Sequence, residues 1–223
     1  MTSIGQSIPR IDAVGKVKGE ALYPGDFNLE NQAYMKVLFA NRPHAQIVRI
    51  DKSQAESLPG VLAVFTAEDV PFNEYGLGTK AQPVLCGPGS SKPYTDRVRF
   101  IGDQVALVVA ETEEIAAQAC KLIEVEYHDL PIVTDPRIAR EAGQPLIHPD
   151  RGSNVLIGYR IRKGDVDAGF TSSDVIVEGY YQTPIQEHAY LQPEAGISYV
   201  DAEGRVVVVV GGQWAHEDRE QVA

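Results

Sequence analysis

The glutamine Gln213 is the residue whose type and position best suit contact with a ligand. It follows a run of five valines, Val206 to Val210, and the glycine pair Gly211 and Gly212. Folds that alternate strands and helices usually bind ligands at the carboxyl ends of strands, and glycines let a bulky ligand approach the backbone. An amide offers a donor and an acceptor there without charge. An ordinary strand-to-helix turn would use the same residues, so both interpretations stay open.

A second polar cluster lies in the stretch QEHAYLQPEAG, residues 186–196, which contains Glu187, His188, Gln192 and Glu194. A carboxylate beside an imidazole could work as an acid and a base in catalysis. The same side chains could instead hydrogen-bond to the backbone of a structured turn, as buried polar groups must. We favour the turn, and both interpretations predict that the segment is buried.

Two glycine-rich stretches match nucleotide-binding motifs without the context that gives those motifs meaning. GLGTKA, residues 76–81, has the spacing G-x-G-x-x-G/A, but no buried strand leads into it and a proline-bearing coil follows it. GPGSSK, residues 87–92, lacks the spacing of a P-loop. We therefore do not interpret GLGTKA as a nucleotide site, and GPGSSK is more simply a flexible turn.

The histidines and cysteines form no recognised metal-binding motif. None of the five histidines belongs to an H-x-x-x-H or H-E-x-x-H pair. The two cysteines, Cys86 and Cys120, lie far apart, and neither is part of a C-x-x-C pair. Any metal or redox centre should therefore use other ligands or another chain.

The strands that would position these residues are predicted from apolar segments bounded by Pro, Gly, Asn or Asp. The predicted strands are residues 34–39, 46–50, 61–65, 105–110, 175–183, 196–199 and 205–210. A continuous apolar run indicates a strand that is covered on both sides. The valine run before Gln213 is therefore expected to be buried on both faces.

Helices are fewer. The best candidate is residues 113–123, where one face is apolar, Thr112 can cap the start, and Glu113 and Glu114 suit the positive end of the helix dipole. A shorter helix is expected at residues 52–57, capped by Asp51. Strands mixed with helices predict an α+β or α/β fold.

Two stretches have no periodicity. Residues 71–96 read as one long loop, which is usually functional or poorly ordered. Residues 131–152 contain four prolines and two glycines, and we interpret them as a linker between domains.

The bulk composition narrows the class of protein. With 20 basic and 31 acidic residues the net charge is -11, which disfavours a nucleic-acid partner. The first residues lack the pattern of a signal peptide, and no apolar run approaches the roughly 20 residues that span a bilayer. We expect a cytoplasmic protein without a membrane partner, and 223 residues allow one large domain or two small ones.

Several segments, taken in order, resemble one known family. They are PRIDAVGKVKGEALYPGDF, NRPHAQIVRIDKSQAESLPGVLAVFTAEDVP, VRFIGDQVALVVAETEEIAAQACKLIEVEYHDLP and GDVDAGF. These segments are similar to the large subunit of the xanthine dehydrogenase and aldehyde oxidase family of molybdenum hydroxylases, and the resemblance covers nearly the whole chain. The final stretch, from EHAYLQPEAG onward, is most similar to bacterial xanthine dehydrogenase subunits.

The resemblance implies an α+β fold with a definite division. Residues 1–130 would form an amino-terminal arm and an α/β hammerhead domain, and residues 131–152 the linker. Residues 153–223 would be the truncated beginning of a mixed β/α molybdenum cofactor-binding domain.

The resemblance also implies an activity. Members of the family are oxidoreductases that hydroxylate a purine-like N-heterocycle or an aldehyde, with water as the oxygen source. They use a molybdenum pterin cofactor, and iron–sulfur clusters and FAD are expected here on partner subunits. Gly212 and Gln213 would contact the cofactor, with the Gln213 amide beside an oxygen ligand of the metal, where it orients the centre without acting as a base.

Other family residues have no counterpart here. The glycine-rich segment, the substrate-orienting arginine and the catalytic glutamate of the family would come after residue 223, so we assign no catalytic residue to this chain. We expect the chain to be inactive without the remainder of its subunit. Gln192 stands where the family usually has glutamate.

A second hypothesis is a non-catalytic assembly or interaction module, or the remnant of a truncated gene. A reading frame immediately downstream that encodes the missing family segments would favour the enzyme.

Overall fold

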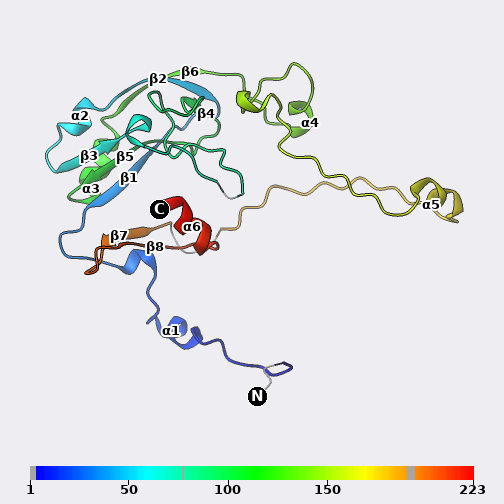
Figure 1. Ribbon diagram of the computed structural model, residues 1–223, viewed down its shortest axis with the longest axis horizontal. Coiled ribbons are helices and arrows are strands. Elements are labelled where there is room, and N and C mark those ends of the chain that lie inside the picture. Colours follow the sequence, from blue (N-terminus) through cyan, green and yellow to red (C-terminus); the bar gives the residue numbers. More distant parts are fainter. Residues whose placement is uncertain (1–3, 77, 190–193) are drawn as a thin grey trace. The chain divides into compact units, whose positions relative to one another are not determined.

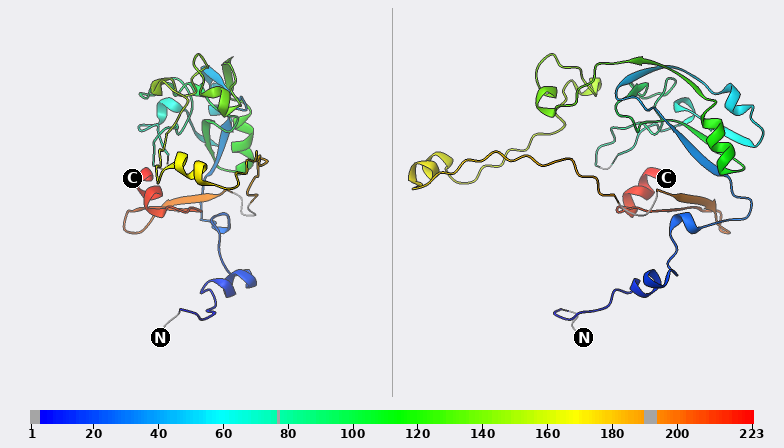
Figure 2. Two further views of the ribbon diagram at one scale, coloured as in Figure 1. Left: turned by 90° about the vertical axis from the view of Figure 1, so that its right-hand side faces the viewer. Right: turned by 180° about the vertical axis from the view of Figure 1, so that it is seen from behind.

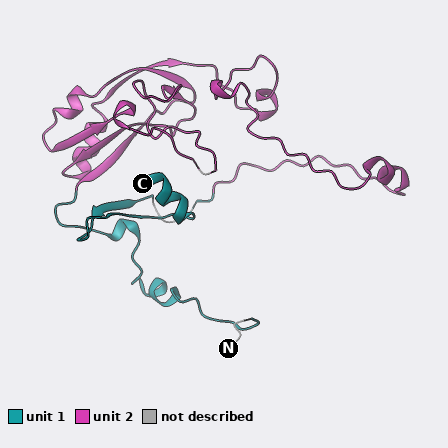
Figure 3. Ribbon diagram, viewed as in Figure 1, with its two compact units in different colours: residues 1–32, 188–223 teal, residues 33–187 magenta. Residues whose placement is uncertain are grey.

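The computed structural model describes residues 4–76, 78–189 and 194–223 (Figure 1). The chain divides into two compact units, one made of Met1–Gln32 with His188–Ala223 and the other of Ala33–Glu187 (Figure 3). The fold is α+β, as predicted. Within the described ranges, no helix combines the length and the apolar composition needed to span a membrane.

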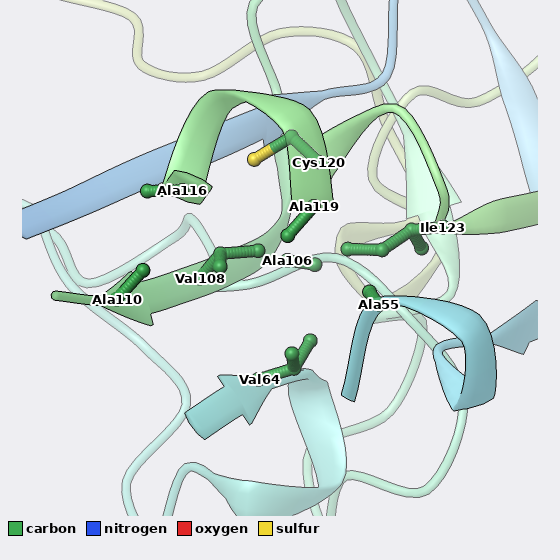
Figure 4. Close-up of a cluster of buried hydrophobic side chains, with 9 residues drawn as sticks. All are labelled: Ala55, Val64, Ala106, Val108, Ala110, Ala116, Ala119, Cys120 and Ile123. Carbon is green, nitrogen blue, oxygen red and sulfur yellow. The ribbon is translucent and has the colours of Figure 1, made fainter. Parts of the chain in front are cut away.

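The larger unit is built on a three-stranded antiparallel sheet in the order β1-β5-β3. Its strands are β1 (Tyr34–Phe39), β5 (Gln104–Ala110) and β3 (Val61–Phe65). Helix α3 (Glu113–Cys120) packs on this sheet and α2 (Ser53–Glu56) lies beside it. Small side chains allow the close approach, and Figure 4 shows Ala116 and Ala119 of α3 near Ala106 and Val108 of β5.

A second three-stranded antiparallel sheet has the order β4-β2-β6. Its strands are β4 (Arg97–Val98), β2 (Ala45–Asp51) and β6 (Glu124–Asp129). Its core contains Ile47, Cys86, Val98 and Val105. The strands predicted at residues 34–39, 46–50, 61–65 and 105–110 are confirmed to within one residue at each end.

The two predicted helices of this unit are also confirmed, with shorter bounds. Thr112 Oγ1 accepts a hydrogen bond from the Ile115 amide at 3.2 Å, which is the predicted cap. The helix ends at Cys120 rather than at residue 123, although Ile123 remains in the core with 8% of its surface exposed. At α2, Asp51 Oδ1 accepts from the Ser53 amide at 3.1 Å.

Replacing Thr112 by alanine should lower the free energy of unfolding by about 1 kcal/mol, because it removes the acceptor for a free amide at the start of α3. Urea unfolding measures the change. Thr112→Ser keeps the hydroxyl and should lose much less. Equal losses in the two variants would contradict the capping role.

The loop expected at residues 71–96 is irregular but well anchored. Asn73 is buried, and its side chain donates to the Leu85 carbonyl at 2.8 Å and accepts from the Leu85 amide at 2.9 Å. Thr95 Oγ1 donates to the Gly87 carbonyl at 3.1 Å. A single turn, η2 (Ala67–Asp69), precedes the loop.

The rest of this unit contains little regular structure. It carries α4 (Pro136–Ala139), η3 (Pro149–Arg151) and α5 (Val166–Ser172), and Figure 2 shows extended chain leading to and from α5. The strand predicted at residues 175–183 is wrong, because no strand is assigned there. Val175 and Val177 are 77% and 85% exposed. Such a segment becomes a strand only when a neighbour completes its hydrogen-bond ladder, and no strand of the described chain does so.

The smaller unit contains a hairpin and a helix that follows it. Strands β7 (Gly196–Val200) and β8 (Val206–Val210) pair antiparallel, and α6 (Ala215–Val222) ends the unit. Its amino-terminal part holds α1 (Ala13–Lys18) and η1 (Pro24–Asp26). The hairpin strands predicted at residues 196–199 and 205–210 are confirmed to within one residue.

The predicted burial of the valine run is wrong. Val206, Val208 and Val210 are 70%, 43% and 49% exposed. A continuous apolar run shows that a strand can be buried on both faces, whereas actual burial needs layers above and below it. β8 belongs to a sheet of two strands, and no such pair of layers covers it within this unit.

Candidate functional site

Gln213 lies in the short connection between β8 and α6, at the carboxyl end of the strand. Its side chain is exposed, and the amide has no hydrogen-bond partner among the described residues. The amide is therefore free to donate and accept toward a group outside the chain. The position predicted from the sequence is confirmed, and its role stays a prediction.

Gly212 brings the backbone close to the first turn of α6. A β-carbon added at Gly212 would lie 2.5 Å from Asp218 Oδ2, so any larger residue would force that carboxylate to move. Glu217 and Asp218 both lie in the first turn of the helix, where negative charge is favoured. The glycine thus keeps the start of α6 packed against the end of β8.

A hollow of about 470 Å³ lies between β8 and α6. It is mainly apolar, and Asp218 and Arg219 are the two charged residues in its lining. The remaining lining residues are Val206, Val208, Val210, Gly212, Ala215, Val222 and Ala223. Its size is that of sites for small molecules. Gln213 is not part of this lining, so the hollow and the free amide are separate features.

The polar cluster predicted in residues 186–196 is not buried where the structure describes it. Glu187, His188 and Glu194 are all exposed, so the prediction of a buried segment is wrong for these three residues. The backbone there is irregular and is not covered by other elements, whereas both sequence-based interpretations needed a covering layer. Gln192 lies outside the described residues.

Tyr75 and Gln82, on either side of the stretch GLGTKA, exchange backbone hydrogen bonds of 2.8 and 3.2 Å, and Gly78 has a positive φ of 70°. No helix follows in the described residues up to β4. Because a helix amino terminus is what binds the phosphates of a dinucleotide, the predicted loop is confirmed at this place.

The two cysteines are buried thiols. Burial raises the pKa of Cys86 to about 12 and also raises the pKa of Cys120. A thiolate is the form that binds metals and attacks electrophiles, so both thiols are unsuited to those roles at neutral pH. Across the part of the chain that the structure describes, no group of three or more His, Cys, Asp or Glu side chains could hold a metal ion.

Two residues with a clear structural role were missed by the sequence analysis. Arg99 and Asn154 bind backbone groups of the segment interpreted as a linker. No pattern of residue types signals such contacts, because their partners are main-chain atoms that any residue would supply.

Two family models match the chain. The model described as aldehyde oxidase and xanthine dehydrogenase, a/b hammerhead domain, matches residues 18–131. The model described as molybdopterin cofactor-binding domain matches residues 147–223.

Curated relatives are much longer than this chain. A probable subunit of xanthine dehydrogenase from Bacillus subtilis is 40% identical over 215 residues, which are 96% of this chain and 28% of the relative. The nicotinate dehydrogenase large molybdopterin subunit from Eubacterium barkeri is 35% identical over 221 residues, covering 99% of this chain and 50% of the relative. The chain therefore spans at most half the length of these two proteins.

Solved structures show the same fold. Quinoline 2-oxidoreductase from Pseudomonas putida 86 superimposes with a TM-score of 0.77 and 27% identity, over 93% of this chain and 26% of that one. Aldehyde oxidoreductase from Desulfovibrio gigas gives a TM-score of 0.72 and 28% identity, over 90% of this chain and 23% of that one.

Proposed function

The chain belongs to the aldehyde oxidase and xanthine dehydrogenase family, and from this premise we propose that it is part of a molybdenum hydroxylase large subunit. In this proposal residues 1–130 are the arm and hammerhead domain, 131–152 connect the domains, and 153–223 begin the cofactor-binding domain. The two family models, matched to residues 18–131 and 147–223, support this order.

The proposed reaction is the oxidative hydroxylation of a carbon in a purine-like N-heterocycle or an aldehyde. A C–H bond and water give a C–OH group, two protons and two electrons. A bound molybdenum pterin cofactor supplies the redox chemistry of this reaction. Relatives whose names refer to xanthine, nicotinate and quinoline support an N-heterocycle, and the aldehyde oxidoreductase from Desulfovibrio gigas supports an aldehyde, so the proposal keeps both substrate classes.

The observation that carries the proposal is the free amide of Gln213 inside the segment matched by the cofactor-binding model. A neutral amide can donate a hydrogen bond to an oxygen ligand without adding charge, and it cannot accept a proton as a base at neutral pH. Gly212, without a β-carbon, leaves the backbone open beside it. These residues fit one wall of a cofactor site, in which Gln213 would orient the group.

Activity in this proposal needs partners. One wall does not hold a ligand, because binding sites enclose most of the ligand surface, so the remainder of the subunit would complete the pocket. Iron–sulfur clusters need cysteine thiolates, whereas the thiols of Cys86 and Cys120 are buried and protonated. This supports the proposal that another subunit carries the iron–sulfur clusters, and we place FAD on a partner subunit as well. The cytoplasmic location stays a prediction.

Molybdenum content tests the proposal. The purified chain alone should carry almost no molybdenum. Co-expressed with the carboxyl-terminal part of a related large subunit and with iron–sulfur and flavin subunits, the complex should carry near-stoichiometric molybdenum and oxidise an N-heterocycle or an aldehyde.

Two results would contradict it. Near-stoichiometric molybdenum on the chain alone would show that the other walls are not needed. A stable complex with the iron–sulfur and flavin subunits that never takes up molybdenum would favour the assembly module.

A further inference from the structure

The segment interpreted as a linker is folded on itself by one side chain. Asn154 Nδ2 donates to the carbonyls of Ala139 and Pro145, both at 2.9 Å, and Asn154 Oδ1 accepts from the Ile147 amide at 2.9 Å. Both donors and the acceptor of this amide are therefore used within residues 139–154. A flexible linker would not keep three such contacts on one side chain.

Arg99, which directly follows β4, binds the same segment to the part of the larger unit that contains the two sheets. Arg99 Nε donates to the Ile147 carbonyl at 3.0 Å, across 48 positions of sequence. Its other nitrogens donate to the carbonyls of Arg97 and Tyr94, at 3.2 and 3.1 Å. The planar guanidinium thus joins three carbonyls from two separate stretches of chain.

Both contacts converge on one peptide. The amide of Ile147 donates to Asn154 and its carbonyl accepts from Arg99. Arg99 is itself held in place, because its backbone amide donates to the Asp103 carboxylate, which also accepts from the Phe100 amide. The neighbouring His148 is half-buried, and burial together with the positive charge of Arg99 lowers the pKa of its imidazole.

We propose that Arg99 and Asn154 make residues 139–154 a rigid brace, folded on itself and fixed to the end of β4. We call these residues the brace. It gives a fixed starting point, at residue 155, to the exposed extended chain that carries α5.

The brace can be tested on the chain alone. Trypsin cleaves after Arg140 and Arg151, which lie within the brace and have exposed side chains. It also cleaves after Arg162 in the exposed extended stretch, which serves as an internal reference in every digest. Limited proteolysis therefore reports how often the brace opens.

In the parent chain, cleavage in the brace should be slow relative to cleavage after Arg162. Arg99→Lys replaces three spread guanidinium nitrogens by one compact ammonium, which cannot reach all three carbonyls at once. Asn154→Ala removes the contacts at the other end. Losing a hydrogen bond to a charged group changes an opening equilibrium by about 10–100-fold, so cleavage at the two brace sites should accelerate by that factor in Arg99→Lys. Asn154→Ala should also accelerate it.

Controls separate this effect from general unfolding. Thermal unfolding of the hammerhead core should keep its midpoint in Asn154→Ala, whose contacts all lie outside the two sheets. Glu178→Gln, a change of charge in the exposed stretch away from the Arg162 site, should leave cleavage in the brace unaltered. Unchanged brace cleavage in Asn154→Ala would overturn the proposal even if Arg99→Lys failed to fold.

Failure of the complex to take up molybdenum with the parent chain would count against the proposed function alone, because the proteolysis result does not depend on the cofactor.

Discussion

Replacing Gln213 by alanine should lower turnover per bound molybdenum by about 10–100-fold in the assembled enzyme, which is the usual loss when a group that orients a metal ligand is removed. The amide is exposed and without a partner among the described residues, so the replacement breaks no contact within the described chain. Activity should fall without vanishing, because the cofactor's main anchors and the catalytic base lie elsewhere in this proposal. Steady-state rates divided by the molybdenum content measure the effect.

Two variants make this result specific. Gln221→Ala is the same change within α6, eight positions after Gln213, and it should leave turnover per molybdenum unaltered. Gln213→Asn keeps the amide on a shorter side chain and should recover part of the rate. If Gln213 were only a turn residue with no role at the metal, its replacement would hardly change the rate. An unchanged turnover per molybdenum in Gln213→Ala would therefore contradict the proposal that Gln213 orients the metal centre.

Replacing Ile47 by alanine should lower the free energy of unfolding of the larger unit by about 2–5 kcal/mol, the range for truncating a buried isoleucine. Ile47 lies on β2, the central strand of the β4-β2-β6 sheet, and is only 1% exposed. It packs with Cys86, Val98 and Val105, so the shortened side chain leaves a cavity. Domains of this kind are stable by about 5–15 kcal/mol, and the loss should be large in a urea titration.

The neighbouring residue supplies the control. Val48 is 52% exposed at an irregularity in the pairing of the same strand, and Val48→Ala should change the free energy of unfolding by less than about 0.5 kcal/mol. Similar losses in both variants would mean that the loss in Ile47→Ala does not come from burial of the side chain.

Features that depend on local chain order were predicted well. β1 and β3 have the predicted bounds because apolar segments between turn residues favour strands whatever lies around them. Thr112 caps α3 because the hydroxyl and the amide that it accepts are only three positions apart. The position of Gln213 at the end of β8 follows from chain order in the same way.

The end of α3 shows a limit of periodicity. Ile123 continues the apolar pattern of the helix and is buried, yet the helix stops at Cys120. A buried apolar residue can belong to a helix or to the turn that leaves it, since both can face the same core.

Burial was decided only by the tertiary structure. The valine run of β8 and the apolar residues 175–177 have the composition of covered strands, and both are exposed here. Residue type measures how favourable burial would be, whereas burial itself depends on whether another layer lies there.

The sequence by itself indicated the family, through a resemblance along nearly the whole chain, and it predicted β1, β2, β3 and β5 and the place of Gln213 from residue types at short spacing. It did not predict β4 and β6, the outer strands of the second sheet. Only the tertiary structure decided that residues 139–154 form a folded segment. Arg99 reaches a carbonyl 48 positions away and Asn154 reaches one 15 positions away. Every residue carries a backbone carbonyl, so the type of a residue does not indicate which side chain will bind its carbonyl. Only the fold brings the side chain and the carbonyl together.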